Sequence, residues 1–250
     1  MKIQIIILST LILLLCSCRK ELEYPPQDET GHVTFMVESI SRNSQEGDFQ
    51  DGDAIGIFAI EPITGVYWAT NNKYVYDGNK FKPATEEDDI VVTKGTDFDF
   101  YVYYPYDPNQ NDITNISHVC IDQDTKSGWV SSDFMTATYT DAIIDYSIPL
   151  QFKHNYATVE VHVNKNDGVT AATLKNVKYS SRINLLTGQS ITEDSRINLK
   201  MYCYNANDNG NAIFRCTVPV QTLSALSNYV TLSGNTSIDL LAESDMTLSA

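Results

Sequence analysis

Apolar and polar residues alternate along much of this chain, which is the pattern of half-buried β-strands. The longest alternating segment covers residues 149–163, and its second half places alanine or valine at every second position. An earlier segment, residues 32–41, carries Val33, Phe35 and Val37 on one face. Each of these segments therefore predicts a strand with one face in a core.

The rest of the chain repeats this pattern in shorter segments separated by Gly, Asn and Asp. Asp77-Gly78 suits the tight turn of a hairpin. No long helical period occurs, so we predict an all-β chain built as β-sandwiches. Further strands are expected at residues 54–60, 74–76, 80–82, 97–104, 174–184, 197–204, 212–220 and 229–241.

The N-terminus carries an export signal. An apolar run follows Lys2 and ends in Leu15-Cys16-Ser17-Cys18. Leu15 and Ser17 fit a lipobox in which Cys18 receives a diacylglycerol before cleavage, so residues 1–17 are expected to be a signal peptide. The alternatives are an ordinary secretory signal or a membrane anchor, although the run is short for a hydrocarbon core of about 30 Å.

Three segments are expected after the signal peptide. Residues 18–31 are charged, rich in proline and without periodicity, which predicts a lipidated tether. A break near residues 147–151 divides the remainder into two units of similar style. We predict an N-terminal β-sandwich at residues 32–148 and a C-terminal one at residues 149–250.

The charge balance excludes one class of partner. The chain has 17 Lys and Arg against 32 Asp and Glu, a net charge of −15. Nucleic acid is therefore not expected as a partner, because phosphate binding needs a basic face.

The cysteines leave one question open. With Cys18 acylated, Cys120, Cys203 and Cys216 remain in the mature chain. Cys203 and Cys216 could pair across neighbouring strands, or all three could be small apolar residues.

The sequence shows no known catalytic constellation. It has no Gly-x-Ser-x-Gly, no phosphate-binding glycine loop, no His-Glu-x-x-His and no zinc-ligand spacing. His154 and Glu160 would lie about 20 Å apart on one strand, which predicts a solvated face and no metal site. Trp68 and Trp129 could stack sugars, although aromatic residues of β proteins more often pack in cores. We predict no enzyme, no cofactor and no metal.

Five blocks of sequence resemble, in order, those of one known family. They are Phe49-x-x-Gly-Asp-x-Ile-Gly-Ile-Phe, Asn72 to Tyr76, Phe98-x-Phe-Tyr-x-Tyr-Tyr-Pro-Tyr, Asp133-Phe-Met-Thr-Ala and Phe152-x-His-x-x-Ala-x-Val-x-Val. Behind a lipobox, this order resembles the fimbrillin-like (Mfa-like) family of Bacteroidota surface lipoproteins, over about residues 32–165. A late Gly-x-x-Tyr strand and a final Trp-containing strand of the family have no counterpart, so a short or divergent C-terminal unit is expected.

The resemblance implies an outer-membrane lipoprotein with two tandem transthyretin-like β-sandwich domains. Many members of the family are subunits of the type V pilus, in which an Arg-directed protease cuts after the first strand. Arg42, followed by Asn43, stands at that position. The groove vacated by Val33, Phe35 and their neighbours would then accept a strand from another subunit.

The expected function is therefore a structural component of a type V pilus, assembled by strand exchange and contributing to cell adhesion. Its expected partners are other pilin subunits and, through the lipid, the outer membrane. The protein would be at the cell surface, and in the pilus if it is processed. The alternative is a surface lipoprotein that never polymerises and binds a glycan or host ligand.

Overall fold

The computed structural model describes most of the chain after the predicted tether. The described residues are 29–41, 49–121, 123–141, 143, 145–164, 168–204, 211–235 and 237–250. The predicted signal peptide, Cys18, Arg42 and Asn43 lie outside them.

Nearly all of the regular secondary structure in the described residues is β-strand, which confirms the prediction of an all-β chain. The strands of the N-terminal half are β1 (Thr30–His32), β2 (Thr34–Ser41), β3 (Ala54–Ile60), β4 (Tyr67–Tyr76), β5 (Phe81–Pro83), β6 (Val91–Thr93), β7 (Asp99–Tyr104), β8 (Ile116–Val119), β9 (Met135–Tyr139) and β10 (Ser147–His154). Those of the C-terminal half are β11 (Tyr156–Asn164), β12 (Val169–Lys178), β13 (Ser180–Asn184), β14 (Gln189–Thr192), β15 (Arg196–Lys200), β16 (Tyr202–Tyr204), β17 (Asn211–Pro219), β18 (Gln221–Leu223), β19 (Asn228–Gly234), β20 (Ser237–Leu241) and β21 (Met246–Leu248). The helix α1 (Lys126–Ser131) interrupts the strands, and no described helix is long and apolar enough to cross a membrane.

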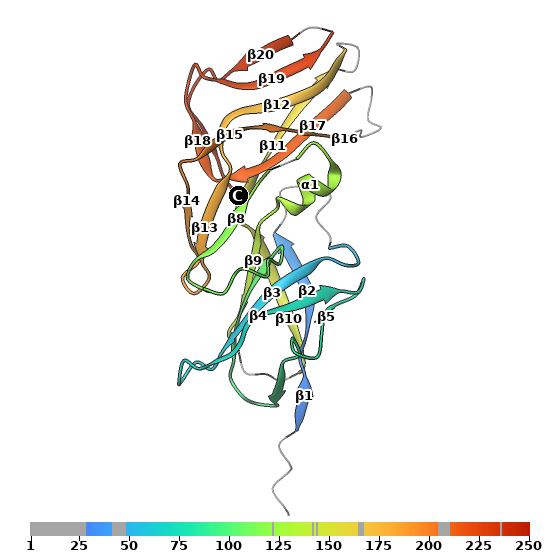
Figure 1. The fold of residues 1–250 in the computed structure, drawn as a ribbon, viewed down its shortest axis with the longest axis vertical. Coiled ribbons are helices and arrows are strands. Elements are labelled where there is room, and N and C mark those ends of the chain that lie inside the picture. Colours follow the sequence, from blue (N-terminus) through green and yellow to red (C-terminus); the bar gives the residue numbers. More distant parts are fainter. Residues whose placement is uncertain are drawn as a thin grey trace, which may run out of the picture.

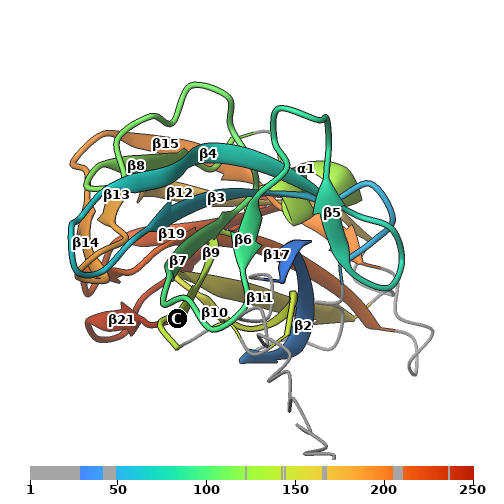
Figure 2. The same ribbon diagram turned by 90° about the horizontal axis from the view of Figure 1, so that it is seen from below.

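The N-terminal unit is a barrel. Its strands are joined in the closed order β10-β2-β5-β4-β3-β7-β9, and β1 pairs with β6 beside it. Aromatic rings fill the interior, where Phe35, Tyr74, Phe81, Phe100 and Phe152 are all buried. In Figure 2, seen from below, β2, β5, β4, β3 and β7 lie in front of the strands of the second unit.

The C-terminal unit is built from separate sheets around a second core. One sheet has the order β11-β17-β16, another has the order β15-β12-β19-β20, and β18 pairs with β21. Leu174, Phe214, Val218 and Val230 are buried in this second core, together with Cys216. The register places Cys203 opposite Phe214, two positions from Cys216.

The two units are stacked along the long axis of the molecule, and β8 connects them (Figure 1). Although β8 comes from the N-terminal half, it pairs with β13 in the sheet β14-β13-β8. A third group of buried residues fills this junction and includes Phe58, Tyr103, Phe134 and Tyr156. Contacts of this kind attach the barrel to the second unit through packed side chains as well as through the chain itself.

The predicted division between residues 148 and 149 falls inside β10. This strand pairs with β2 from Ser147 to Lys153 and with β9 at Lys153 and His154, so all of it lies in the barrel. The first core ends with Phe152 and the second begins with Ala157. The transthyretin-like character of the two units stays a prediction.

Candidate functional site: the first strand and its groove

The strand β2 is inserted between β10 and β5 in the barrel. It pairs in parallel with β10 from Thr34, opposite Ser147, to Ser41, opposite Lys153. On its other side the ladder with β5 has a single position, Phe35 opposite Phe81. The main-chain hydrogen bonds of β2 therefore go mostly to one neighbour.

The apolar face of β2 points into the barrel. Val33 and Phe35 are 0% exposed, and the Phe35 ring makes edge contacts with Tyr74 at 5.1 Å and Phe100 at 5.3 Å. Val37 is half-buried and packs against the same core. The structure thus places two of the three predicted groove residues in the core and the third at its margin.

The opposite face of β2 is polar or exposed, as the alternation predicts. Met36 is 41% exposed, and the carboxylate of Glu38 accepts a hydrogen bond of 2.9 Å from the amide of Gln151. The side-chain ammonium of Lys80 donates to Thr34 Oγ1 at 3.4 Å. The strand is therefore held by its buried face and its ladder more than by polar side chains.

The residues before β2 are held by hydrogen bonds to β6 and to the residue that precedes it. The Val33 N–H donates to the Ile90 carbonyl at 2.9 Å, and Thr30, Gly31 and His32 pair with β6. Gly31 is required here, because a Cβ at this position would lie 2.5 Å from the ring of Tyr146. Two sheets thus hold the segment before Arg42.

Removing this segment would open a long apolar slot. Phe81, Tyr74 and Phe100 would lose their contacts with Phe35, and β10 would lose its parallel neighbour. Burying an apolar side chain of this size stabilises by about 1.5–3 kcal/mol. A sheet edge beside such a slot is a template for adding another strand.

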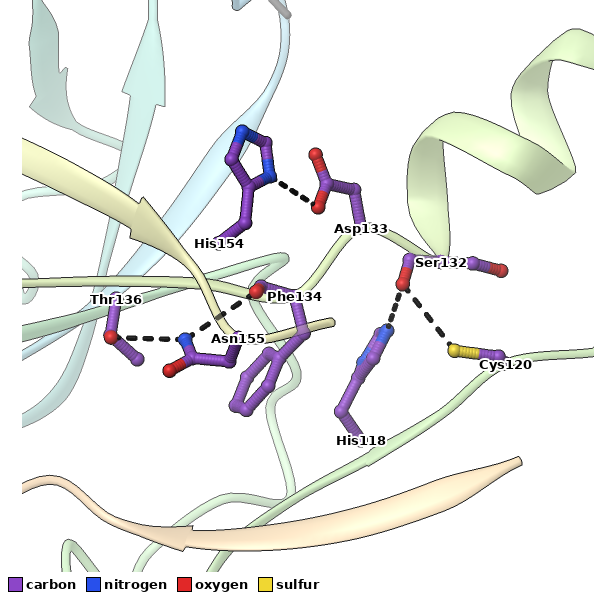
Figure 3. A network of polar contacts seen from close by, with 8 residues as sticks. All are labelled: His118, Cys120, Ser132, Asp133, Phe134, Thr136, His154 and Asn155. Carbon is purple, nitrogen blue, oxygen red and sulfur yellow. Dashed lines mark hydrogen bonds and ion pairs between the residues drawn. The ribbon is translucent and has the colours of Figure 1, made fainter. Parts of the chain in front are cut away.

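A polar network lies at the junction between the units, next to the C-terminal end of α1 (Figure 3). The Ser132 carbonyl is within 3.3 Å of His118 Nε2, and it accepts from the Cys120 thiol at 3.4 Å. His154 Nδ1 contacts a carboxylate oxygen of Asp133 at 2.7 Å.

Asn155 makes a separate set of polar contacts at the junction (Figure 3). Its side-chain amide donates to Thr136 Oγ1 at 3.0 Å and to the Phe134 carbonyl at 3.4 Å. Its main-chain N–H donates to the same carbonyl at 2.8 Å. Asn155 is the residue between β10 and β11, so these bonds hold the connection between barrel and second unit in one position.

This network has the chemistry of a structural contact and not of a catalytic pair. Burial raises the pKa of the Cys120 thiol well above its usual value and lowers the pKa of His118 to about 4. Both groups are therefore neutral near pH 7, whereas a nucleophilic cysteine is a thiolate in an electropositive site. The His118 ring stacks on Phe134 at 5.0 Å.

The expectation of a solvated face for His154 and Glu160 was wrong for His154. The two residues lie on different strands, and the His154 side chain is only 11% exposed against Asp133. Glu160 pairs instead with Arg215 at 2.6 Å and with His162 at 3.1 Å. Among the described residues, no group of His, Cys, Asp or Glu could hold a metal ion.

The importance of Asn155, Tyr146 and Gly31 was not apparent from the sequence. Each acts through a partner more than 15 residues away, and no local motif identifies such a partner. The signal that could have pointed to Gly31 is its place in a strand, where glycine often marks a close approach.

The fold defines a class of all-β protein in which β2, with one face in the core, completes a barrel. A sequence profile described as fimbrillin-like matches residues 41–248, and the chain belongs to this family. The match extends through the second unit, whereas the five sequence blocks that resemble the family cover only about residues 32–165. No curated protein matches the chain.

Solved structures share the fold. A candidate cell adhesion protein from Bacteroides ovatus is 16% identical with a TM-score of 0.65, and 87% of each chain is covered. One from Bacteroides uniformis is also 16% identical, with a TM-score of 0.62, and covers 86% of this chain and 85% of its own. A fimbrial protein from Bacteroides ovatus is 17% identical with a TM-score of 0.53, over 88% of this chain and 47% of its own.

Proposed function

We propose that this protein is a structural subunit of a type V pilus, exported as a lipoprotein and assembled by strand exchange. The observation that carries the proposal is the position of β2. Its Phe35 and the preceding Val33 are buried in the barrel core, and the strand ends at Ser41, directly before Arg42. A cut after Arg42 would separate a core strand from the rest of the chain.

The strand is suited to exchange because noncovalent contacts alone would hold it after such a cut. It forms a parallel ladder with β10, a single pair with β5 and an apolar contact with the core. An incoming strand with apolar residues at alternate positions could restore all three. The buried apolar area provides the driving force for refilling the groove.

The proposed location follows from the N-terminal lipid. Cys18 would anchor the precursor in the outer membrane with the barrel at the cell surface, and other subunits would be its partners. Membership of the fimbrillin-like family supports this location. Solved structures of the same fold that are named for fimbriae or cell adhesion support the role in adhesion.

The test compares two arginine variants in cells that assemble the pilus. Arg42→Ala is expected to abolish SDS-resistant ladders of multimers, because the first strand stays attached and occupies its groove. Arg19→Ala, which removes an arginine of the tether, is the matched control and is expected to leave the ladders intact. Ladders that persist in Arg42→Ala would overturn cleavage at this residue.

A second function is favoured by one observation, an apolar pocket beside the exposed Trp68. It suits a surface lipoprotein that binds a ligand without polymerising. This alternative predicts a monomer that keeps its acylated Cys18, whereas the pilus proposal predicts a chain that begins at Asn43.

A further inference from the structure

A pocket of about 580 Å³ opens beside β6, at the end of the barrel where β1 lies. Figure 1 places β1 at the bottom of the molecule, far from the second unit. Ile63, Trp68 and Phe98 supply much of an apolar lining. The volume lies in the range of about 300–1,000 Å³ that is usual for small-ligand sites.

Trp68 presents an exposed ring that is held in place. The side chain is 56% exposed, yet its indole N–H donates to the Val91 carbonyl at 3.2 Å. The ring also makes an edge contact with Phe98 at 5.5 Å. A ring fixed by two contacts loses little side-chain entropy when a ligand stacks on it.

The polar groups of the pocket are hydroxyls and carboxylates. Thr96 donates its hydroxyl to the Thr93 carbonyl at 2.6 Å, which leaves the Thr96 oxygen able to accept a hydrogen bond. Asp97 is exposed in the same wall. None of the residues that line the pocket is a lysine, an arginine or a histidine.

The second carboxylate of the pocket, Glu61, is occupied by its own loop. It accepts main-chain hydrogen bonds from Ile63 at 3.0 Å and Thr64 at 2.7 Å. These bonds and the Thr64 hydroxyl lower the pKa of Glu61. Asp97 therefore remains the carboxylate available to a ligand.

We propose that this pocket binds a neutral saccharide. The apolar C–H face of a sugar ring would stack on Trp68, and its hydroxyls would donate to the Asp97 carboxylate and the Thr96 oxygen. An acidic sugar is disfavoured because the pocket offers Asp97 and no cation. A cationic peptide would find Asp97 as its one free carboxylate, because the Glu61 oxygens already accept hydrogen bonds from their own loop, and it is tested below as the competing occupant.

The inference does not depend on strand exchange. Thr30 is the only lining residue that precedes Arg42, and the pocket is complete in the uncut chain. The full chain carrying Arg42→Ala therefore tests the pocket alone, whatever the outcome for pilus assembly.

The experiment follows the two indole N–H signals by NMR while sugars are added. The probes are glucose, galactose, mannose, N-acetylglucosamine and their short oligosaccharides, with glucuronate and acetyl-arginine amide as charged counterparts. The Trp68 signal is expected to shift with at least one neutral sugar, while the signal of the buried Trp129 stays in place. No shift with any neutral sugar, or a shift with the arginine amide alone, would overturn the proposal.

Variants separate binding from folding. Asp97→Asn removes a charged acceptor at an exposed position and is expected to weaken sugar binding about tenfold. Tyr67→Ala is the control, because Tyr67 is 47% exposed and neighbours Trp68 on β4 but does not line the pocket. Thermal unfolding shows whether both variants are folded. If they are folded and bind the sugar equally well, the assigned role of Asp97 is contradicted.

Discussion

At the scale of single residues, the account depends on the difference between the two faces of β2. Phe35 is enclosed by Tyr74 and Phe100, whereas its neighbour Met36 is 41% exposed. The alternation of the sequence predicted which side chains point inward, because the period of a strand decides the face. It did not predict that Val37 is only half-buried, since that depends on how far the barrel core extends.

Phe35→Ala is expected to lower the free energy of unfolding by about 3–5 kcal/mol, because it empties a buried aromatic site. Met36→Ala, one residue further, is the matched control and is expected to cost less than about 1 kcal/mol. Urea unfolding of the two variants measures the difference. Equal losses would show that β2 is not anchored by its buried face.

The burial of His118 at the junction predicts that the free energy of unfolding depends on pH. The pKa of His118 is lowered to about 4 by burial, from an ordinary value near 6.5. The unfolded chain therefore binds more protons than the folded chain between these values, and stability falls as the pH falls from about 6.5 to 4. This contribution is on the order of 2–3 kcal/mol.

His118→Asn is expected to remove this loss of stability between about pH 6.5 and pH 4. Free energies of unfolding would be measured from pH 7 to pH 4 for both chains, so that the carboxylates common to both cancel in the difference. A difference that does not change with pH would contradict the buried, neutral state of His118.

At the scale of elements, local patterns predicted strands better than they predicted pairing. The strand at residues 54–60 and the turn at Asp77-Gly78 occur as predicted, with Gly78 at φ 86°. The segment 174–184 divides into β12 and β13, and Asn176 at φ 52° lies in an irregular part of β12. The single segment 229–241 is a hairpin of β19 and β20.

The pairing of β2 with β10 could not be predicted from local sequence. The two strands are separated by more than 100 residues, and their parallel register follows from the shared barrel core. The pairing of β8 with β13 could not be predicted from local sequence either, because both strands are short and they come from different halves of the chain. Alternation marks the face of a strand but not its neighbour.

A chain that begins at Asn43 is expected to be incomplete and to bind the strand it has lost. A peptide of residues 29–41 should bind this chain and raise its Tm, because it restores the ladder with β10 and the burial of Phe35. The same peptide with Phe35→Asp is the control and should bind at least tenfold more weakly. Equal binding of the two peptides, measured by calorimetry, would contradict the groove.

At the scale of the whole molecule, the structure consists of the barrel, the second unit and the junction that packs between them. The second unit has its own core, and the junction attaches it to the barrel through β8 and Asn155. The sequence predicted two units of similar style, but it could not show the contacts that join them. The family places the whole arrangement among fimbrillin-like proteins.

The central proposal is that β2 is cut from the chain after Arg42 and that a strand of another subunit takes its place in the barrel. The most direct measurement is the N-terminal residue of the protein on the surface of cells that make it, determined by mass spectrometry together with the state of Cys18. The account predicts a chain that starts at Asn43 and carries no lipid in the multimers. Multimers whose chains all begin at an acylated Cys18 would contradict it.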